Sequence, residues 1–149
     1  MAEATDCPCP LCASSQVEHY LADSRRDYLQ CGVCRLVFVP PHQHLSAAEE
    51  KAHYDLHEND PADPGYRKFL SRLATPLLEK LADKSVGLDF GSGPGPTLSL
   101  MMTEAGHRVA IFDPYYAPDH SCLRQHYDFI TATEVVEHLS RPGEELDRL

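Results

Sequence analysis

Long apolar runs are missing from this chain of 149 residues, and so is any excess of basic residues. No stretch approaches the roughly 20 consecutive apolar residues that a membrane-spanning helix needs. The first residues, Met1 to Asp6, lack the basic and apolar regions of a secretory signal peptide. The sequence therefore predicts a cytoplasmic protein with no membrane partner.

Basic residues are outnumbered, with 13 Lys and Arg against 23 Asp and Glu, and the formal net charge is -10. Proteins that hold nucleic acid through its phosphates need clustered Lys and Arg. The charge balance therefore argues against a nucleic-acid partner.

Cysteine is almost absent from the second half, where Cys122 stands alone and is interpreted as an ordinary thiol. The other five lie in the first 34 residues. In a reducing cytosol such clustering indicates metal or redox chemistry rather than disulfides. A thioredoxin-like redox pair is disfavoured because no βαβ pattern flanks these cysteines.

Four of the early cysteines form two Cys-x-x-Cys knuckles, Cys9 to Cys12 and Cys31 to Cys34, with eighteen residues between them. This gap lies within the roughly 15 to 20 residues typical of a four-thiolate zinc site. Four thiolates close the tetrahedron, so the predicted zinc is structural. Cys7 is an alternative to Cys9, but it would leave a wider gap to Cys12 than the partner knuckle has. With a hairpin between the knuckles, residues 1–40 are predicted to form a zinc ribbon.

Residues 41–84 are predicted to form a connector and an amphipathic helix. The connector is rich in proline and contains four histidines whose spacing fits no tetrahedral metal set. A short helix is expected from Ser46 to Asp55. Apolar residues then recur at intervals of three and four from Tyr66 to Leu81, which predicts a helix that packs on the following sheet.

Residues 85–149 alternate predicted strands and helices, which indicates a parallel sheet with ligands at the carboxyl ends of its strands. The first strand, 85–90, leads into three glycines at alternate positions, Gly91, Gly93 and Gly95. A helix over 98–105 and a strand over 108–112 follow, and that strand ends on Asp113. A carboxylate there can bind both hydroxyls of a ribose. The pattern predicts a site for an adenosine-containing cofactor.

The glycine spacing helps to choose the cofactor. A dinucleotide-binding loop needs glycine at position 96, where this chain has Pro96. The run from Asp89 to Gly95 instead resembles the first motif of class I S-adenosylmethionine-dependent methyltransferases. The resemblance covers residues 85–139 and includes Asp113 and the Glu-Val-Val-Glu-His-Leu run that follows a predicted strand over 127–132. A zinc ribbon ahead of such a domain is similar to the domain order of a group of bacterial small-molecule methyltransferases.

The resemblance implies an α/β fold, here a zinc ribbon followed by an incomplete Rossmann-like parallel sheet. It implies that Asp89 orients the amino-acid part of S-adenosylmethionine and that the three glycines let this part lie against the loop. Asp113 is implied to bind the ribose. A bland alternative, in which these residues have only structural roles, is that both aspartates are cap or turn residues and that the glycines form a tight turn.

Glu134 and His138 are four residues apart, so on a helix they would share a face. The resemblance places them at the substrate edge, where either can act as a base if the methyl acceptor is a hydroxyl. The alternative is that Glu134 caps the helix while the neighbouring valines pack it down. Glu134, Glu137 and His138 also resemble part of the metal site of small-RNA terminal 2′-O-methyltransferases, but the further histidine that this site needs is absent downstream.

Two departures from the family are expected to matter. Only thirteen residues separate Asp113 from Tyr127, too few for the usual helix, strand and adenine-contacting loop. The class I fold has seven strands, and this chain ends in the helix after the fourth, so we expect a truncated product. The leading hypothesis is a methyltransferase for a small molecule with a hydroxyl or carbon acceptor. The alternatives are a zinc-ribbon interaction module with a non-catalytic Rossmann remnant and an NAD-binding oxidoreductase domain.

Overall fold

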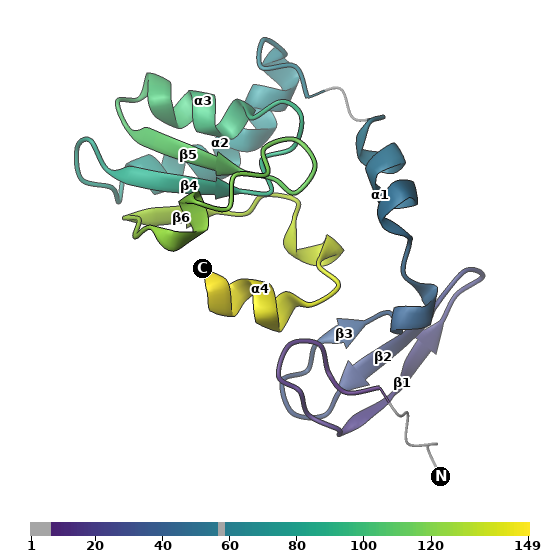
Figure 1. The fold of residues 1–149 in the computed structure, drawn as a ribbon. Coiled ribbons are helices and arrows are strands. Elements are labelled where there is room, and N and C mark those ends of the chain that lie inside the picture. Colours follow the sequence, from purple (N-terminus) through teal and green to yellow (C-terminus); the bar gives the residue numbers. More distant parts are fainter. Residues whose placement is uncertain (1–6, 57–58) are drawn as a thin grey trace. The chain divides into compact units, whose positions relative to one another are not determined.

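The computed structural model describes residues 7–56 and 59–149, which belong to two compact units (Figure 1). The first unit combines the described residues up to Ala47 with His138–Leu149, and the second is formed by the described part of Ala48–Glu137. The boundaries predicted at residues 40 and 84 stay predictions. Within the described residues, no helix is long and apolar enough to cross a membrane.

The first unit is built on an antiparallel sheet in the order β1-β2-β3. Strands β1 (Val17–Ala22) and β2 (Asp27–Cys31) pair across a turn in which the Asp23 carboxylate accepts the backbone N–H groups of Arg25 and Arg26. Strand β3 (Val37–Phe38) pairs with β2 on its other side. The hairpin predicted between the knuckles is confirmed.

The core of this sheet is small. Its buried residues are Cys9, Val17, Leu29 and Cys31, with Cys7, Cys34, Leu36 and Phe38 packed against them in partly buried positions. After Val17, every residue of β1 is exposed. Three of these eight side chains belong to the paired knuckles, so apolar burial alone contributes little to the stability of the unit.

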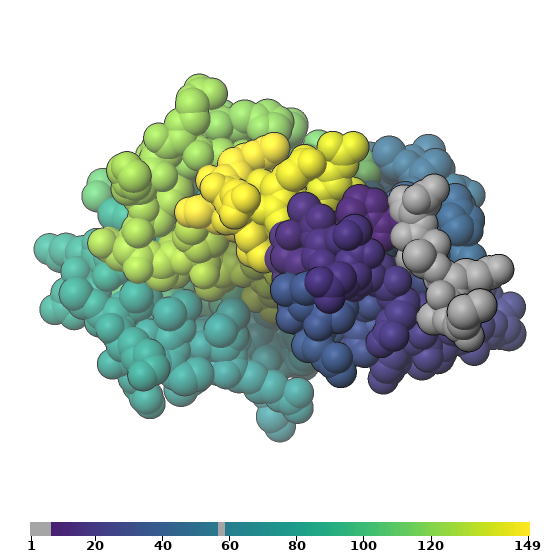
Figure 2. All heavy atoms as spheres, turned by 90° about the horizontal axis from the view of Figure 1, so that it is seen from below, coloured from purple at the N-terminus to yellow at the C-terminus, as the bar shows by residue number. Residues whose placement is uncertain are grey.

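A C-terminal helix, α4 (Pro142–Arg148), completes the first unit. Its Gly143 donates a backbone hydrogen bond of 3.1 Å to the carbonyl oxygen of Pro10, in the first knuckle. A Cβ at Gly143 would lie 2.6 Å from the carbonyl oxygen of Leu11, so only glycine permits this approach. Figure 2 shows the atoms of α4, in yellow, against the dark purple atoms of the knuckle.

The second unit begins with two helices, α1 (Ala47–Tyr54) and α2 (Pro64–Leu78). The helix predicted over 46–55 is confirmed, and none of its residues is buried. Helix α2 begins two residues before the predicted start because the Asp63 carboxylate accepts the N–H of Gly65, and Pro64 suits the first helical position.

Three parallel strands form the sheet of the second unit, in the order β5-β4-β6. The central strand is β4 (Val86–Phe90), with β5 (Arg108–Phe112) and β6 (Phe129–Thr131) on either side. Helix α3 (Thr97–Glu104) connects β4 to β5. The predicted parallel sheet is confirmed, and all three strands present their carboxyl ends at the same edge.

One apolar core joins α2 and α3 to the sheet. Leu70 and Ala74 of α2 pack with Leu98 and Met102 of α3 and with Phe129 of β6. Figure 1 shows the two helices side by side on one face of the strands. This core is the reason that the amphipathic helix predicted from residue 66 onward packs on the sheet.

Candidate functional site

The four knuckle cysteines meet in the first unit. The Sγ atoms of Cys9, Cys12, Cys31 and Cys34 all lie within 4.8 Å of one another. Across the knuckles, Cys9 Sγ is 3.5 Å from Cys34 Sγ and Cys12 Sγ is 3.6 Å from Cys31 Sγ. Cys7 is outside this group. The cluster is of a kind that can hold a metal ion.

The two knuckles have the same backbone structure. The residue after each knuckle, Ala13 or Arg35, has a left-handed φ of 58° or 66°. Its N–H bonds to the carbonyl oxygen of the first cysteine, at 2.9 Å in the first knuckle and 3.1 Å in the second. Two segments of different sequence therefore fold into matching halves that face each other.

The second knuckle favours a thiolate. The backbone N–H groups of Cys34 and Val33 point at Cys31 Sγ from 3.5 and 3.4 Å. Hydrogen bonds from these groups lower the pKa of the Cys31 thiol to about 6. Burial, and then hydrogen bonds with the neighbouring thiols, raise the pKa of Cys34 to about 12, so without a metal the thiolate of this knuckle is on Cys31. Metals bind the thiolate and not the thiol.

In the second unit, the glycine loop leads from the carboxyl end of β4 into α3 and is hydrogen-bonded to the carboxyl end of β5. The N–H groups of Gly91 and Ser92 both donate to the carbonyl oxygen of Phe112, at 2.7 and 3.1 Å. Gly91 and Gly93 have φ of 72° and 67°, a region that glycine occupies without the steric penalty of a side chain. The glycines are thus required by the backbone of the loop.

The space at two of the glycines is occupied by the protein itself. A Cβ at Gly91 would lie 2.4 Å from Val135, and a Cβ at Gly95 would lie 1.8 Å from the carbonyl oxygen of Asn59. At Gly93 the nearest neighbour is the amide nitrogen of Asn59, at 3.5 Å. Of the three, Gly93 therefore has the most open surroundings, and the other two also serve close packing.

Asp113 lies opposite the loop at the end of β5. One oxygen of its buried carboxylate accepts the N–H of Gly93 at 2.9 Å. The other accepts the N–H groups of Tyr115 and Tyr116 at 2.8 and 3.1 Å. Asp113 is thus a turn residue, as the bland alternative expects, and at the same time it holds the glycine loop. Each carboxylate oxygen has two lone pairs, so Oδ1 is fully occupied and Oδ2 has capacity for one further donor.

Asp89 is a buried carboxylate near the carboxyl end of β4. Only 4% of its surface is exposed, and its Oδ1 accepts a hydrogen bond of 2.8 Å from the hydroxyl of Thr131 in β6. Burial raises the pKa of Asp89 to about 6, although the Thr131 hydrogen bond acts in the opposite direction. A cationic ligand group at this position would restore the ionised form.

The helix on which Glu134 and His138 would share a face, expected after the strand over 127–132, is not formed. Residues 133–135 form a turn, and only Val136–His138 makes a single 3-10 turn. Glu134 takes a left-handed φ of 56°, which ends any helical path at that residue. The argument that Glu134 and His138 share a helical face therefore fails. Both side chains are exposed, and their catalytic roles stay a prediction.

Some polar groups of this edge were missed from the sequence. Within the described residues, the buried hydroxyl oxygens of Ser92 and Thr133 have no hydrogen-bond partner. Tyr66 of α2 lies near enough to Asp89 and Glu134 that burial and then these two carboxylates raise its pKa. The sequence feature that could have pointed to Thr131 and Thr133 is their position at the end of a short apolar strand, beside Glu134.

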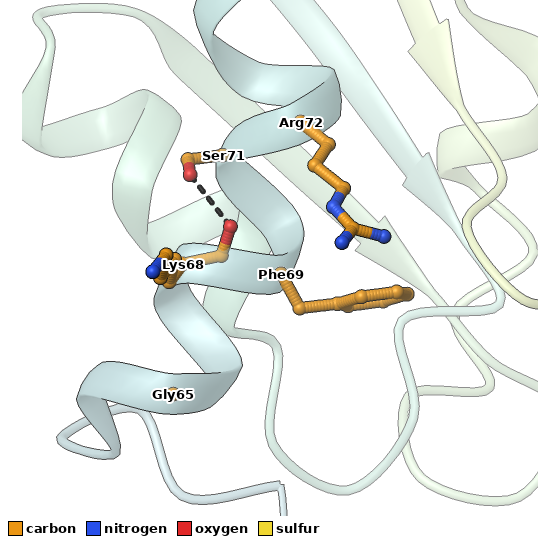
Figure 3. Close-up of a pocket in the computed structure, with 5 residues that line it drawn as sticks. All are labelled: Gly65, Lys68, Phe69, Ser71 and Arg72. Carbon is orange, nitrogen blue, oxygen red and sulfur yellow. Dashed lines mark hydrogen bonds between the residues drawn. The ribbon is translucent and has the colours of Figure 1, made fainter.

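A separate open hollow lies on the outer side of α2 (Figure 3). It is lined by Gly65, Lys68, Phe69, Ser71 and Arg72, all from this one helix. The Arg72 guanidinium lies over the Phe69 ring at 5.8 Å from its centroid. None of the predicted site residues lines this hollow, so it is distinct from the carboxyl edge of the sheet.

A family model described as a methyltransferase domain matches residues 62–149, more than half of the chain. The chain belongs to this family. The methyltransferase domain includes α2, the parallel sheet, the glycine loop and Asp113, but not α1 or the cysteine cluster. Among curated proteins, none matches the chain.

Proposed function

We propose that the methyltransferase domain binds S-adenosylmethionine at the carboxyl edge of the β5-β4-β6 sheet and serves methyl transfer to a small-molecule acceptor. The observation that carries the proposal is the 2.9 Å hydrogen bond between the Gly93 amide and the Asp113 carboxylate. It brings the glycine loop and the acidic residue after β5 together, within the residues that match the methyltransferase family. Ligands of open parallel sheets bind at such edges.

The groups at this edge fit the cofactor. Its ribose requires a hydrogen-bond acceptor, and the remaining lone pair of Asp113 Oδ2 can take one of the two hydroxyls. Its ammonium group suits the buried carboxylate of Asp89. The hydroxyls of Ser92 and Thr133 are buried without a partner, a situation that costs about 1–3 kcal/mol per group unless a ligand satisfies them.

When bound, S-adenosylmethionine supplies a methyl group on a sulfonium, and the reaction needs in-line positioning of the acceptor. In this proposal Asp89 and Asp113 hold the two ends of the cofactor, and Gly93 leaves the loop open toward it. If the acceptor is a hydroxyl, Glu134 or His138 takes its proton. The acceptor class, a small molecule with a hydroxyl or a nucleophilic carbon, rests on the family resemblance of the sequence.

We further propose that the cysteine cluster holds a structural zinc. Zinc bound by four thiolates at about 2.3 Å places the sulfurs about 3.8 Å apart, and two of the Sγ pairs are at 3.5 and 3.6 Å. Four protein ligands leave no open coordination position for a substrate. The zinc therefore holds the first unit together and takes no part in methyl transfer.

The proposal is tested by calorimetric titration of the zinc-loaded chain with S-adenosylhomocysteine, the product form of the cofactor. We expect binding that weakens at least about tenfold in Asp113→Ala, since about 1.5–3 kcal/mol is typical of a hydrogen bond to a charged group. NAD serves as the comparison ligand and is expected not to bind. Absence of S-adenosylhomocysteine binding to a folded sample, or equal binding by Asp113→Ala, contradicts the proposal.

A further inference from the structure

Helix α1 lies outside the residues that match the methyltransferase family, yet it belongs to the same compact unit as the sheet. It contacts the turn that follows β5. The hydroxyl of Tyr115 donates a 2.8 Å hydrogen bond to Glu50 Oε2, and the hydroxyl of Tyr116 donates to Asp55, one residue past the end of α1. The rings of Tyr54 and Tyr115 are 6.2 Å apart, and Lys51 Nζ lies 5.4 Å from the centre of the Tyr116 ring.

The same turn holds Asp113. The backbone N–H groups of Tyr115 and Tyr116 both donate to Asp113 Oδ1, while Gly93 donates to Oδ2. Tyr115 is thus fixed at two points, with its backbone on Asp113 and its hydroxyl on Glu50. A continuous chain of hydrogen bonds runs from α1 through Tyr115 and Asp113 to the glycine loop.

Helix α1 depends on these contacts. It has eight residues and buries none of them, and an isolated helix of this length is not stable in water. Of the side chains that reach the tyrosines, Glu50 and Lys51 lie in α1, and Asp55 directly follows it and bonds to Lys51, four residues earlier. Hydrogen bonds to Glu50 and Asp55 raise the pKa of Tyr115 and of Tyr116 to about 12, so at neutral pH both phenols keep their protons and donate these hydrogen bonds.

The connector also reaches the glycine loop directly. The carbonyl oxygen of Asn59 lies 1.8 Å from the position that a Cβ at Gly95 would take. Its side-chain amide nitrogen lies 3.5 Å from the corresponding position at Gly93. Residues of the connector therefore contact both groups that the proposed function assigns to the cofactor, the loop and the turn of Asp113.

We propose that α1 contributes to cofactor binding. Glu50 acts through Tyr115 as a positioning residue for the Asp113 carboxylate. This inference rests on the proposed function. Without the hydrogen bond between Glu50 and Tyr115, the turn and the Asp113 carboxylate are held less firmly in the free protein. Binding of the nucleoside must then also order this carboxylate, which weakens the affinity. Coupling of this kind is reciprocal: the cofactor that orders Asp113 also stabilises α1.

The test measures binding to the zinc-loaded full chain with two probes. S-adenosylhomocysteine contains the nucleoside and the amino-acid end, whereas 5′-methylthioadenosine contains only the nucleoside end. Tyr115→Phe and Glu50→Ala remove the same hydrogen bond from opposite sides. Each is expected to weaken both probes by a similar factor, about fivefold to twentyfold, within the usual range of coupling between sites.

The matched control is Tyr28→Phe, which removes a 3.0 Å hydrogen bond of the same type, from Tyr28 to Asp23, in the first unit. It is expected to leave both affinities unchanged. Glu50→Ala also removes the hydrogen bond from Tyr54, so the double variant with Tyr115→Phe and Glu50→Ala is expected to bind no more weakly than Glu50→Ala alone, because the shared bond can be lost only once. Hydrogen exchange provides a second readout: S-adenosylhomocysteine should slow exchange in α1 of the wild type more than in Tyr115→Phe.

Three outcomes overturn the inference. The first is binding within twofold of wild type in both single variants, and the second is additive loss in the double variant. The third is a loss confined to S-adenosylhomocysteine, which would place the effect at the amino-acid end. If the wild type binds neither probe, the proposed function itself fails and this inference fails with it.

Discussion

The two units of this chain are stabilised by different means. In the second unit, α2 and α3 cover a parallel sheet and bury Leu70, Leu98 and Met102 against Phe129, which is an ordinary apolar core. In the first, two of the four buried core residues are knuckle cysteines, Cys9 and Cys31, and most of β1 is exposed. Side-chain burial can support the second unit alone, whereas we propose that the first depends on a metal bound by its cysteine cluster. We therefore expect a bound metal to affect the folding of the first unit and a bound cofactor to affect the second.

Metal removal is expected to have the largest effect. A chelator, or Cys31→Ser, should unfold β1–β3 and leave the parallel sheet intact, since binding of a structural zinc contributes about 10–16 kcal/mol to the folding of comparable sites. Metal content and amide NMR signals of residues 17–38 measure this effect. Cys7→Ser is the control and should retain the metal. Metal loss in Cys7→Ser but not in Cys9→Ser would exchange the two ligands.

Met102→Ala should produce the opposite pattern. Met102 is 1% exposed at the centre of the second unit, and truncation of such a side chain costs about 2–5 kcal/mol. Urea unfolding followed on signals of β4 and β5 should shift, while those of β1 and β2 stay in place. Leu100→Ala on the same helix is the control, because Leu100 is 40% exposed. Equal shifts in both units would show that the units unfold together.

Gly91→Ala separates backbone strain from packing in the second unit. The left-handed φ costs about 1–2 kcal/mol for a residue with a Cβ, and the contact of 2.4 Å with Val135 adds overpacking of about 1–3 kcal/mol. Gly106→Ala has the strain without the contact, because nothing lies within 4 Å of its Cβ position. Urea unfolding should show a larger loss for Gly91→Ala, partly recovered by Val135→Ala. The same loss in both variants contradicts the packing argument.

Asp89 should make the stability of the second unit depend on pH. Its pKa is about 6 in the folded chain against an ordinary 3.8, so its contribution to stability is complete below pH 4 and is lost as the pH rises through 6. The difference is about 3 kcal/mol at most, from 1.36 kcal/mol per pKa unit. Urea titrations of wild type and Asp89→Asn at pH 4 and pH 7, followed on β4 signals, measure it. An identical pH dependence in the two proteins would exclude the buried carboxylate as the cause.

The same carboxylate should influence cofactor affinity in the other direction. A cationic ammonium binds the ionised form of Asp89, so S-adenosylhomocysteine should bind more tightly as the pH rises from 5 to 7. Calorimetry across this range gives the slope, which Asp89→Asn should flatten. Affinity that falls over this interval in the wild type would place the ammonium elsewhere.

Local signals account for what the sequence could predict. The spacing of the knuckles predicted the cysteine cluster, the apolar periodicity predicted α2, and the glycines predicted the loop after β4. The turn after β6 was missed because Glu134 adopts a left-handed φ with no glycine or asparagine to indicate it. Strand β6 is also shorter than the predicted span, at three residues.

Contacts between distant segments could not be predicted. Nothing in the connector indicates that Asn59 lies against Gly95, or that Glu50 bonds to Tyr115, because each depends on how the chain returns to the sheet. The exposed α1 has no strong apolar face that would have pointed to a partner. Of the groups named from the sequence, Asp89 lies on β4 and Asp113 directly follows β5, while Gly93 lies in the loop after β4.

The central claim is that the carboxyl edge of the parallel sheet is a cofactor site independent of the cysteine cluster. An NMR titration of the zinc-loaded, isotope-labelled chain with S-adenosylhomocysteine tests it most directly. We predict shifts of amide signals in the glycine loop, at Asp113–Ala117 and at Thr131–Val135, with the signals of β1 and β2 unchanged. Shifts confined to the first unit or to the outer side of α2, or none at saturating ligand, would contradict the account.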